Sequence, residues 1–104
     1  MLVLPAELTH KQAAACLHML RQASHTEGDA VVVVDATALE RFDSSALAVL
    51  LECRRACLQD GKGFAVHGLP PRLRELAHLY GVAPLLPNPQ QAAGPAGPDT
   101  PLSS

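Results

Sequence analysis

The order of apolar and polar residues along the chain predicts a central strand–helix–strand unit. Four consecutive valines at 31–34 are typical of a strand buried on both faces. Apolar residues then recur at helical spacing through 45–59, and the short run 64–67 indicates another strand. Gly61 and Gly63 stand between the last two elements, which predicts a turn there.

Further elements flank this unit on both sides. Residues 2–4 are predicted to form a short strand, and a helix begins near Thr9, where Gln12 follows at capping-box spacing. A short third helix is predicted after Pro71, with Gly81 as its C-terminal cap. The inward face of that helix is expected to consist of Leu73, Leu76, Ala77 and Tyr80.

Strands that alternate with helices indicate an α/β domain with some parallel pairing. We therefore expect one mixed sheet of about four strands packed with about three helices. The loop at 36–44 then lies at the carboxyl edge of the valine strand, where open α/β sheets tend to bind ligands. This loop and the helix start that follows it are the candidate functional region.

The length of 104 residues suits a single domain that folds without disulfides or metal. We expect residues 1–87 to form this domain. From 88 to 104 proline and glycine are frequent and apolar residues few, which predicts a disordered tail. The three cysteines lie in predicted helices, which favours small buried thiols over a disulfide framework.

The charge balance argues against nucleic acid as a partner. The net charge is −2, and the chain has eight Lys and Arg residues, one tyrosine, two phenylalanines and no tryptophan. Nucleic-acid binding usually requires a basic surface and stacking side chains. No apolar stretch approaches a membrane span, and the N-terminus lacks the features of a secretion signal. We expect a cytoplasmic protein with no direct membrane insertion.

The polar residues Asp43, Ser44 and Ser45 stand at the start of the helix predicted for 45–59. Because Asp and Ser are common N-caps, one interpretation is that one of them only caps the helix. In the other, a hydroxyl is displayed to a partner at a helix start, where free N–H groups and partial positive charge stabilise an anion or a phosphate.

Two other kinds of site are weakly supported by the sequence. Asp35, Asp43, Ser44 and His67 could be imagined as a hydrolase constellation, but no Gly-x-Ser-x-Gly elbow or glycine-rich phosphate loop is present. We expect neither an enzyme nor a cofactor.

A metal site is conceivable because Cys53 and Cys57 stand four residues apart on one helical face and His67 follows. No Cys-x-x-Cys or paired-histidine spacing supports coordination, so we expect buried thiols and no metal.

The residues around the valine strand resemble the signature of the STAS domain, the fold of bacterial anti-sigma-factor antagonists. That signature is a valine-rich strand ending in Asp, a loop with an apolar residue, and Asp-Ser-Ser-Gly-Leu or Asp-Thr-x-Gly-Leu at a helix start. The matching residues are Val31 to Asp35, Leu39, Phe42 and Asp43-Ser44-Ser45-Ala46-Leu47. The later run from Gly68 to Pro87, with Leu-Tyr-Gly-Val at 79–82, looks most like the MlaB subgroup. The similarity extends over nearly all of residues 2 to 87.

MlaB proteins are cytoplasmic STAS subunits of the ABC transporter that moves phospholipids to or from the inner membrane of Gram-negative bacteria. The resemblance implies a non-catalytic subunit that docks on the transporter's ATPase and is held at the inner membrane by that complex. It implies a phosphoacceptor or hydroxyl-contact role for Ser44. The alternative is an anti-sigma-factor antagonist, in which a partner kinase phosphorylates Ser44 and the added charge breaks the docked interface. The partner-binding residues are expected to be Asp43, Ser44, Ser45, Ala46, Leu47 and Arg41.

The sequence departs from the family pattern at two places. Family members usually begin with an extra strand that pairs with the one corresponding to residues 2–4, and no residues for it are present. Either the protein starts upstream of the given sequence, or the sheet has a bare edge, which favours pairing with another chain, including a second copy in a homodimer. Ala46 also replaces the usual Gly and adds a methyl group where a partner's backbone would approach.

Overall fold

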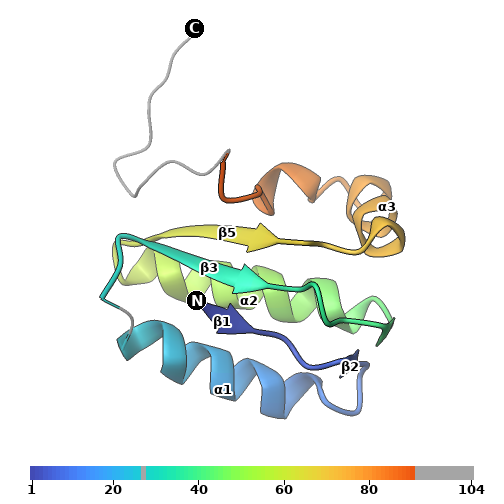
Figure 1. Cartoon of the computed structure of the whole chain (residues 1–104), viewed down its shortest axis with the longest axis horizontal. Coiled ribbons are helices and arrows are strands. Elements are labelled where there is room, and N and C mark those ends of the chain that lie inside the picture. Colours follow the sequence, from blue (N-terminus) through green and yellow to red (C-terminus); the bar gives the residue numbers. More distant parts are fainter. Residues whose placement is uncertain (27, 91–104) are drawn as a thin grey trace, which may run out of the picture.

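The computed structural model describes residues 1–26 and 28–90, and these residues form an α/β domain with three helices (Figure 1). The α/β class predicted from the sequence is confirmed. The helices are α1 (Ala13–Thr26), α2 (Ser45–Gln59) and α3 (Pro71–Leu79), and the 3₁₀ helix η1 is Ala83–Leu85. The strands are β1 (Leu2–Val3), β2 (Glu7–Leu8), β3 (Val31–Asp35), β4 (Arg41–Phe42) and β5 (Gly63–His67).

Three strands form a parallel sheet in the order β1-β3-β5. Leu2 lies opposite Val34, which in turn lies opposite Val66. The prediction of one mixed sheet of about four strands is corrected, because all described pairings are parallel and a second sheet is present. The crossovers explain this: α1 connects β1 to β3 and α2 connects β3 to β5, and a helical crossover joins parallel strands.

The second sheet is the two-residue pair β2–β4, which the sequence pattern did not predict. Leu8 lies opposite Phe42, and the carbonyl of Ala6 accepts hydrogen bonds from the backbone N–H groups of Glu40 and Arg41 at 2.8 and 3.0 Å. This pair ties the loop that precedes α2 to the segment that follows β1. The loop is therefore held by backbone bonds at both of its ends.

β1 occupies one edge of the main sheet, and β3 is its only partner among the strands that the structure describes. An open edge favours pairing with another chain. Association of two copies through this edge stays a prediction. On the other edge, the backbone N–H of Val66 in β5 donates to the carbonyl of Pro87 at 2.8 Å, so the chain after η1 covers part of that strand.

The four valines of β3 alternate between the core and the opposite face. Val32 and Val34 are fully buried, whereas Val31 and Val33 are only half-buried. The prediction of a strand buried on both faces is therefore wrong in detail. Figure 1 gives the reason, because α2 runs behind β3 and β5 and covers one face of the sheet.

The core lies between the sheet and the two long helices, where Leu20 of α1 and Leu50 of α2 are almost completely buried. Cys16, Cys53 and Cys57 are also buried and free, which confirms the prediction of small buried thiols. A hydrogen bond to Cys57, together with burial, raises the pKa of the Cys53 thiol. These thiols therefore pack as small apolar groups.

The helix predicted to begin near Thr9 begins at Ala13, after a turn. In that turn the side-chain oxygen of Gln12 accepts hydrogen bonds from the backbone N–H and the hydroxyl of Thr9 at 2.9 and 2.8 Å. The first of these bonds is one half of a capping box, while the backbone N–H of Gln12 donates to the carbonyl of Thr9 and not to its hydroxyl. After α3, Gly81 has a φ of 74°, a conformation that favours glycine. Tyr80 was predicted to face inward, but it follows the last residue of α3 and is 58% exposed.

None of the described helices is both long and apolar enough to cross a membrane. The predicted tail at 88–104 falls mostly on 91–104, outside the described residues, and stays a prediction.

Candidate functional site

The candidate site lies where the chain leaves the carboxyl end of β3 and enters α2. Ser44 is exposed at this helix start, and Ser45 is half-buried. Ala46 and Leu47 turn inward and are 0% and 3% exposed, so they belong to the core. Of these four predicted site residues, Ser44 is therefore the one whose side chain is exposed.

Asp43 caps α2. One of its carboxylate oxygens accepts a hydrogen bond from the backbone N–H of Ser45 at 2.8 Å, and the other accepts one from the backbone N–H of His10 at 3.2 Å. The Ser45 N–H, and then the His10 N–H, hold the pKa of Asp43 below its ordinary value. The carboxylate thus stabilises the helix start and fastens it to the turn before α1.

Ser44 itself has helical backbone angles, with φ −63° and ψ −17°, and its hydroxyl makes no capping hydrogen bond. The sequence left open whether one of these polar residues merely caps the helix. In the structure these two roles belong to neighbouring residues. Asp43 caps α2, and the hydroxyl of Ser44 is exposed. A negative group on Ser44 would lie at the positive end of the helix dipole.

The base of the loop is fixed by a second carboxylate. Asp35 accepts hydrogen bonds from the hydroxyl of Thr37 at 2.7 Å and from its backbone N–H at 2.9 Å. These two bonds, the hydroxyl first, lower the pKa of Asp35. Thr37 also packs against Gly68, whose φ is 71° and whose missing side chain leaves room for the Thr37 methyl group. The loop after β3 and the turn after β5 are therefore fitted to each other.

Beside Ser44, β4 and α3 contribute Phe42, Arg72 and Leu79, which were not among the predicted partner-binding residues. The guanidinium carbon of Arg72 lies 5.9 Å from the centre of the Phe42 ring, in cation–π geometry. Both residues line a cleft of about 310 Å³ whose far side includes Leu79, which is 76% exposed. We call Arg41, Phe42, Ser44, Arg72 and Leu79 together the Ser44 surface.

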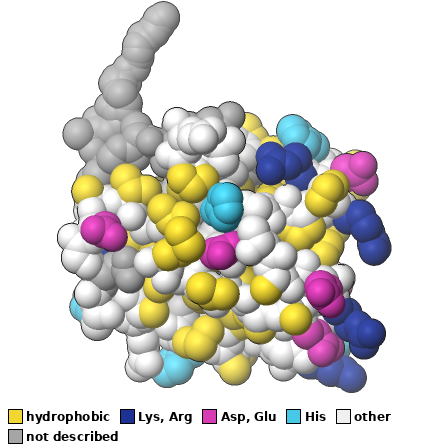
Figure 2. Space-filling model, in the orientation of Figure 1, with side chains coloured by type: hydrophobic (Ala, Val, Ile, Leu, Met, Phe, Trp, Pro, Cys, Tyr) yellow, Lys and Arg dark blue, Asp and Glu magenta, His cyan; other side chains and the backbone are white. Residues whose placement is uncertain are grey.

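The Ser44 surface is bordered by charges of both signs. In Figure 2, Lys and Arg side chains lie among Asp and Glu side chains on the right, at the end of the molecule where Figure 1 places α3 and β2. Arg41 is exposed in β4, next to Phe42. Sequence reasoning missed Arg72 and Leu79 because only the fold brings α3 beside β4.

The residues considered above as a hydrolase constellation lie at two different positions in the structure. Asp35 lies opposite His67 in the register of β3 and β5, while Asp43 is bound to backbone N–H groups and lies 3.4 Å from the Nδ1 atom of His10. Ser44 makes no recorded hydrogen bond to either histidine among the residues that the structure describes. Within that same part of the chain, no group of three or more His, Cys, Asp or Glu side chains could hold a metal ion.

Comparison with known proteins agrees with the family that the sequence motif resembles. The sequence model of the family described as "Mlab, STAS domain" matches residues 1–87. Among solved structures, an anti-sigma-factor antagonist (STAS) domain protein from Planctomyces limnophilus is similar, with a TM-score of 0.69 and 18% sequence identity. The similarity covers 83% of this chain and 77% of that one, and at this identity it shows the fold alone. No curated protein matches the chain significantly.

Proposed function

The chain belongs to the MlaB family of STAS domains, and we propose that it is an interaction subunit that binds the ATPase of a phospholipid-trafficking ABC transporter. STAS domains are generally non-catalytic and commonly act through interaction or as anti-sigma-factor antagonists. In this proposal the Ser44 surface is the docking face, and binding supports assembly or activity of the transporter. The protein then works in the cytoplasm, held at the inner membrane by its partner.

The observation that carries this proposal is the exposed, non-capping hydroxyl of Ser44. A serine needed only for helix stability would use its side chain on the first backbone N–H groups, as Asp43 does here. The neighbouring cleft, which is lined by Phe42, Leu76 and Leu79 together with Arg72 and Glu75, supports the proposal, because a strongly exposed Leu79 beside Phe42 is typical of a surface that a partner covers.

The second candidate function is that of an anti-sigma-factor antagonist controlled by phosphorylation of Ser44. It is favoured by the same free hydroxyl, which lies where the helix dipole would stabilise a phosphate. A phosphate adds a charge of about −1.5 to −2 and would disrupt an interface built on this surface. The two functions therefore share the surface and differ in the partner.

The deciding experiment is affinity purification of the tagged full chain from its native host, with identification of the bound proteins. Wild-type protein is expected to recover an ATPase, and Ser44→Glu is expected to lose it. A buried, unpaired carboxylate in an interface costs about 3–5 kcal/mol, which corresponds to a loss of affinity of about 100-fold or more. The fold should survive, because the new side chain is exposed in the free protein.

Two control variants separate the possible outcomes. Leu58→Glu adds the same charge to an exposed position near the other end of α2 and should leave recovery of the ATPase unchanged. Ser44→Ala should melt like the wild type, because Ser44 makes no capping bond. Full recovery of the ATPase by Ser44→Glu would remove the functional role of this surface, and recovery of a kinase in place of an ATPase would establish the second candidate.

A further inference from the structure

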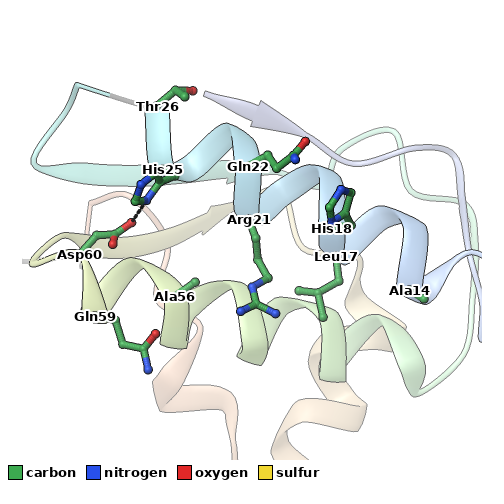
Figure 3. Close-up of a pocket in the computed structure, with 10 residues that line it drawn as sticks. All are labelled: Ala14, Leu17, His18, Arg21, Gln22, His25, Thr26, Ala56, Gln59 and Asp60. Carbon is green, nitrogen blue, oxygen red and sulfur yellow. Dashed lines mark hydrogen bonds and ion pairs between the residues drawn. The ribbon is translucent and has the colours of Figure 1, made fainter.

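A second hollow lies between α1 and α2, and its lining extends from Ala14 to Thr26 along α1 and covers the C-terminal end of α2 (Figure 3). Its volume is about 750 Å³, more than twice that of the cleft beside Ser44. Asp60, which follows the last residue of α2, lines it, whereas Ser44 precedes the first. A helix of 15 residues is about 22 Å long, so the two sites are at opposite ends of α2.

The rim of this groove on the side of α1 carries one arginine between two histidines. His18, Arg21 and His25 recur at intervals of three and four residues, so they follow one side of the helix. No acidic residue occurs anywhere in α1, although the whole chain has a net charge of −2. The positive charge of Arg21 is therefore not offset by an acidic residue of its own helix.

Among the described residues, one carboxylate lines the groove and it is already engaged. Asp60 lies 3.1 Å from the Nδ1 atom of His25. Arg21 has no ion pair with any acidic side chain in the part of the chain that the structure describes. In Figure 3 its side chain reaches from α1 towards α2, over the hollow. A guanidinium in this position is suited to a carboxylate from outside.

The floor of the groove, between the charged residues, is apolar. Ala14, Leu17 and Ala56 supply it, and the two alanines leave space for a side chain that enters from outside. Leu17 and Ala56 are half-buried and Ala14 is exposed. An apolar side chain placed here would cover this surface while an acidic neighbour reached Arg21.

The surroundings favour a helix over an extended strand or a flat membrane. Nearly all of the lining residues belong to α1 and α2, whose interior backbone groups are bonded within the helices, so a strand would find no ladder to join. A lipid surface would meet a concave site where, among the described residues, Arg21 is the one Lys or Arg side chain in the lining. An amphipathic helix suits a groove between two helices. Its apolar face would contact the floor of the groove, and its charged residues would lie at the rim.

We propose that the α1–α2 groove is a second interaction surface, which binds an acidic amphipathic helix of a partner protein through Arg21 and the Ala14–Leu17–Ala56 floor. The proposal does not depend on the function of the Ser44 surface. Together with the docking face proposed at Ser44, it would let one molecule of this protein engage partner segments at both ends of α2. The site would then connect the chain to two elements of a complex at once.

The test uses the full-length, isotope-labelled protein and two synthetic helical peptides. Both peptides carry a stripe of leucines at helical spacing; one carries glutamates beside the stripe and the other carries lysines in their place. The glutamate peptide is expected to shift the NMR signals of α1 and of the second half of α2, and to leave those around Ser44 unchanged. The lysine peptide is expected to bind at least tenfold more weakly.

Charge reversal identifies the residue responsible. Arg21→Glu should weaken the glutamate peptide about tenfold or more and strengthen the lysine peptide, and Arg21→Gln should weaken the first without strengthening the second. Arg55→Glu, an exposed position on α2 outside the groove, is the matched control and should change neither. Equal binding of both peptides, shifts outside the groove, or Arg21-dependent sedimentation with anionic vesicles while neither peptide binds would each overturn the proposal.

Discussion

Replacing Gly68 with Ala tests whether the loop that leads to Ser44 is fitted to the turn after β5. Gly68 has a φ of 71°, and a Cβ atom added there would collide with the methyl group of Thr37. Gly61 provides a matched control, because its φ is 73° and a Cβ atom there would meet nothing within 4 Å. The two substitutions share the backbone penalty and differ in the collision.

The expected magnitudes follow from this difference. A non-glycine residue in the left-handed region costs about 1–2 kcal/mol, so Gly61→Ala should lower the free energy of unfolding by that amount. Gly68→Ala should cost about 1–3 kcal/mol more, the usual range for overpacking. The collision is hard to relieve, because Thr37 is β-branched and rotation of its side chain would break the hydroxyl bond to Asp35.

The assay is urea unfolding of the wild type, both single variants, Thr37→Ala, and the Thr37→Ala, Gly68→Ala double variant. Removing the methyl group should reduce the cost of Gly68→Ala to that of Gly61→Ala, which gives a coupling of about 1 kcal/mol or more. Equal costs for the two glycine substitutions, or additive effects in the double variant, would refute the fit between Thr37 and Gly68.

Two further predictions concern ionisation. The pKa of Asp43 is lowered in the folded protein, mainly by the Ser45 N–H, so its contribution to stability is complete above the ordinary Asp pKa of about 3.9 and is lost as the pH falls through the folded value. The wild type should therefore melt above Asp43→Asn at pH 7, and acid melts should bring the two together; a constant difference would contradict this. Because Cys16, Cys53 and Cys57 are buried and burial raises the pKa of Cys16, a disulfide reagent should modify them slowly in the native protein and all three quickly in denaturant. Rapid modification without denaturant would show that the helices open readily.

The elements with strong periodicity were predictable from the sequence, and the short ones were not. The valine run and the apolar spacing through 45–59 correspond to β3 and α2 because burial against a common core imposes those patterns. β2 and β4 are two residues each, and a pair of residues cannot show alternation. Tyr80 was placed inward because helical spacing continued through it, but α3 ends one residue earlier, at Leu79.

The candidate site was predictable in position but not in the roles of its residues. The motif at 43–47 identified the helix start, because polar residues before an apolar helix are a local signal. The contribution of Arg72 and Leu79 depends on how α3 packs beside β4, and no local pattern carries that information. The α1–α2 groove likewise exists only once the two helices lie together.

The division of roles between Asp43 and Ser44 shows why residue type alone could not decide between a cap and a contact. Both residues are good N-caps, and the outcome depends on which backbone turns first into the helical region. Ser44 already has helical φ and ψ, so the capping oxygen comes from the residue before it. Asp43 also reaches the His10 N–H with its second carboxylate oxygen, whereas a serine has a single oxygen on a shorter side chain. A longer, two-oxygen side chain at 43 thus holds the helix start and the turn before α1 together, and this leaves the hydroxyl at 44 available for a partner.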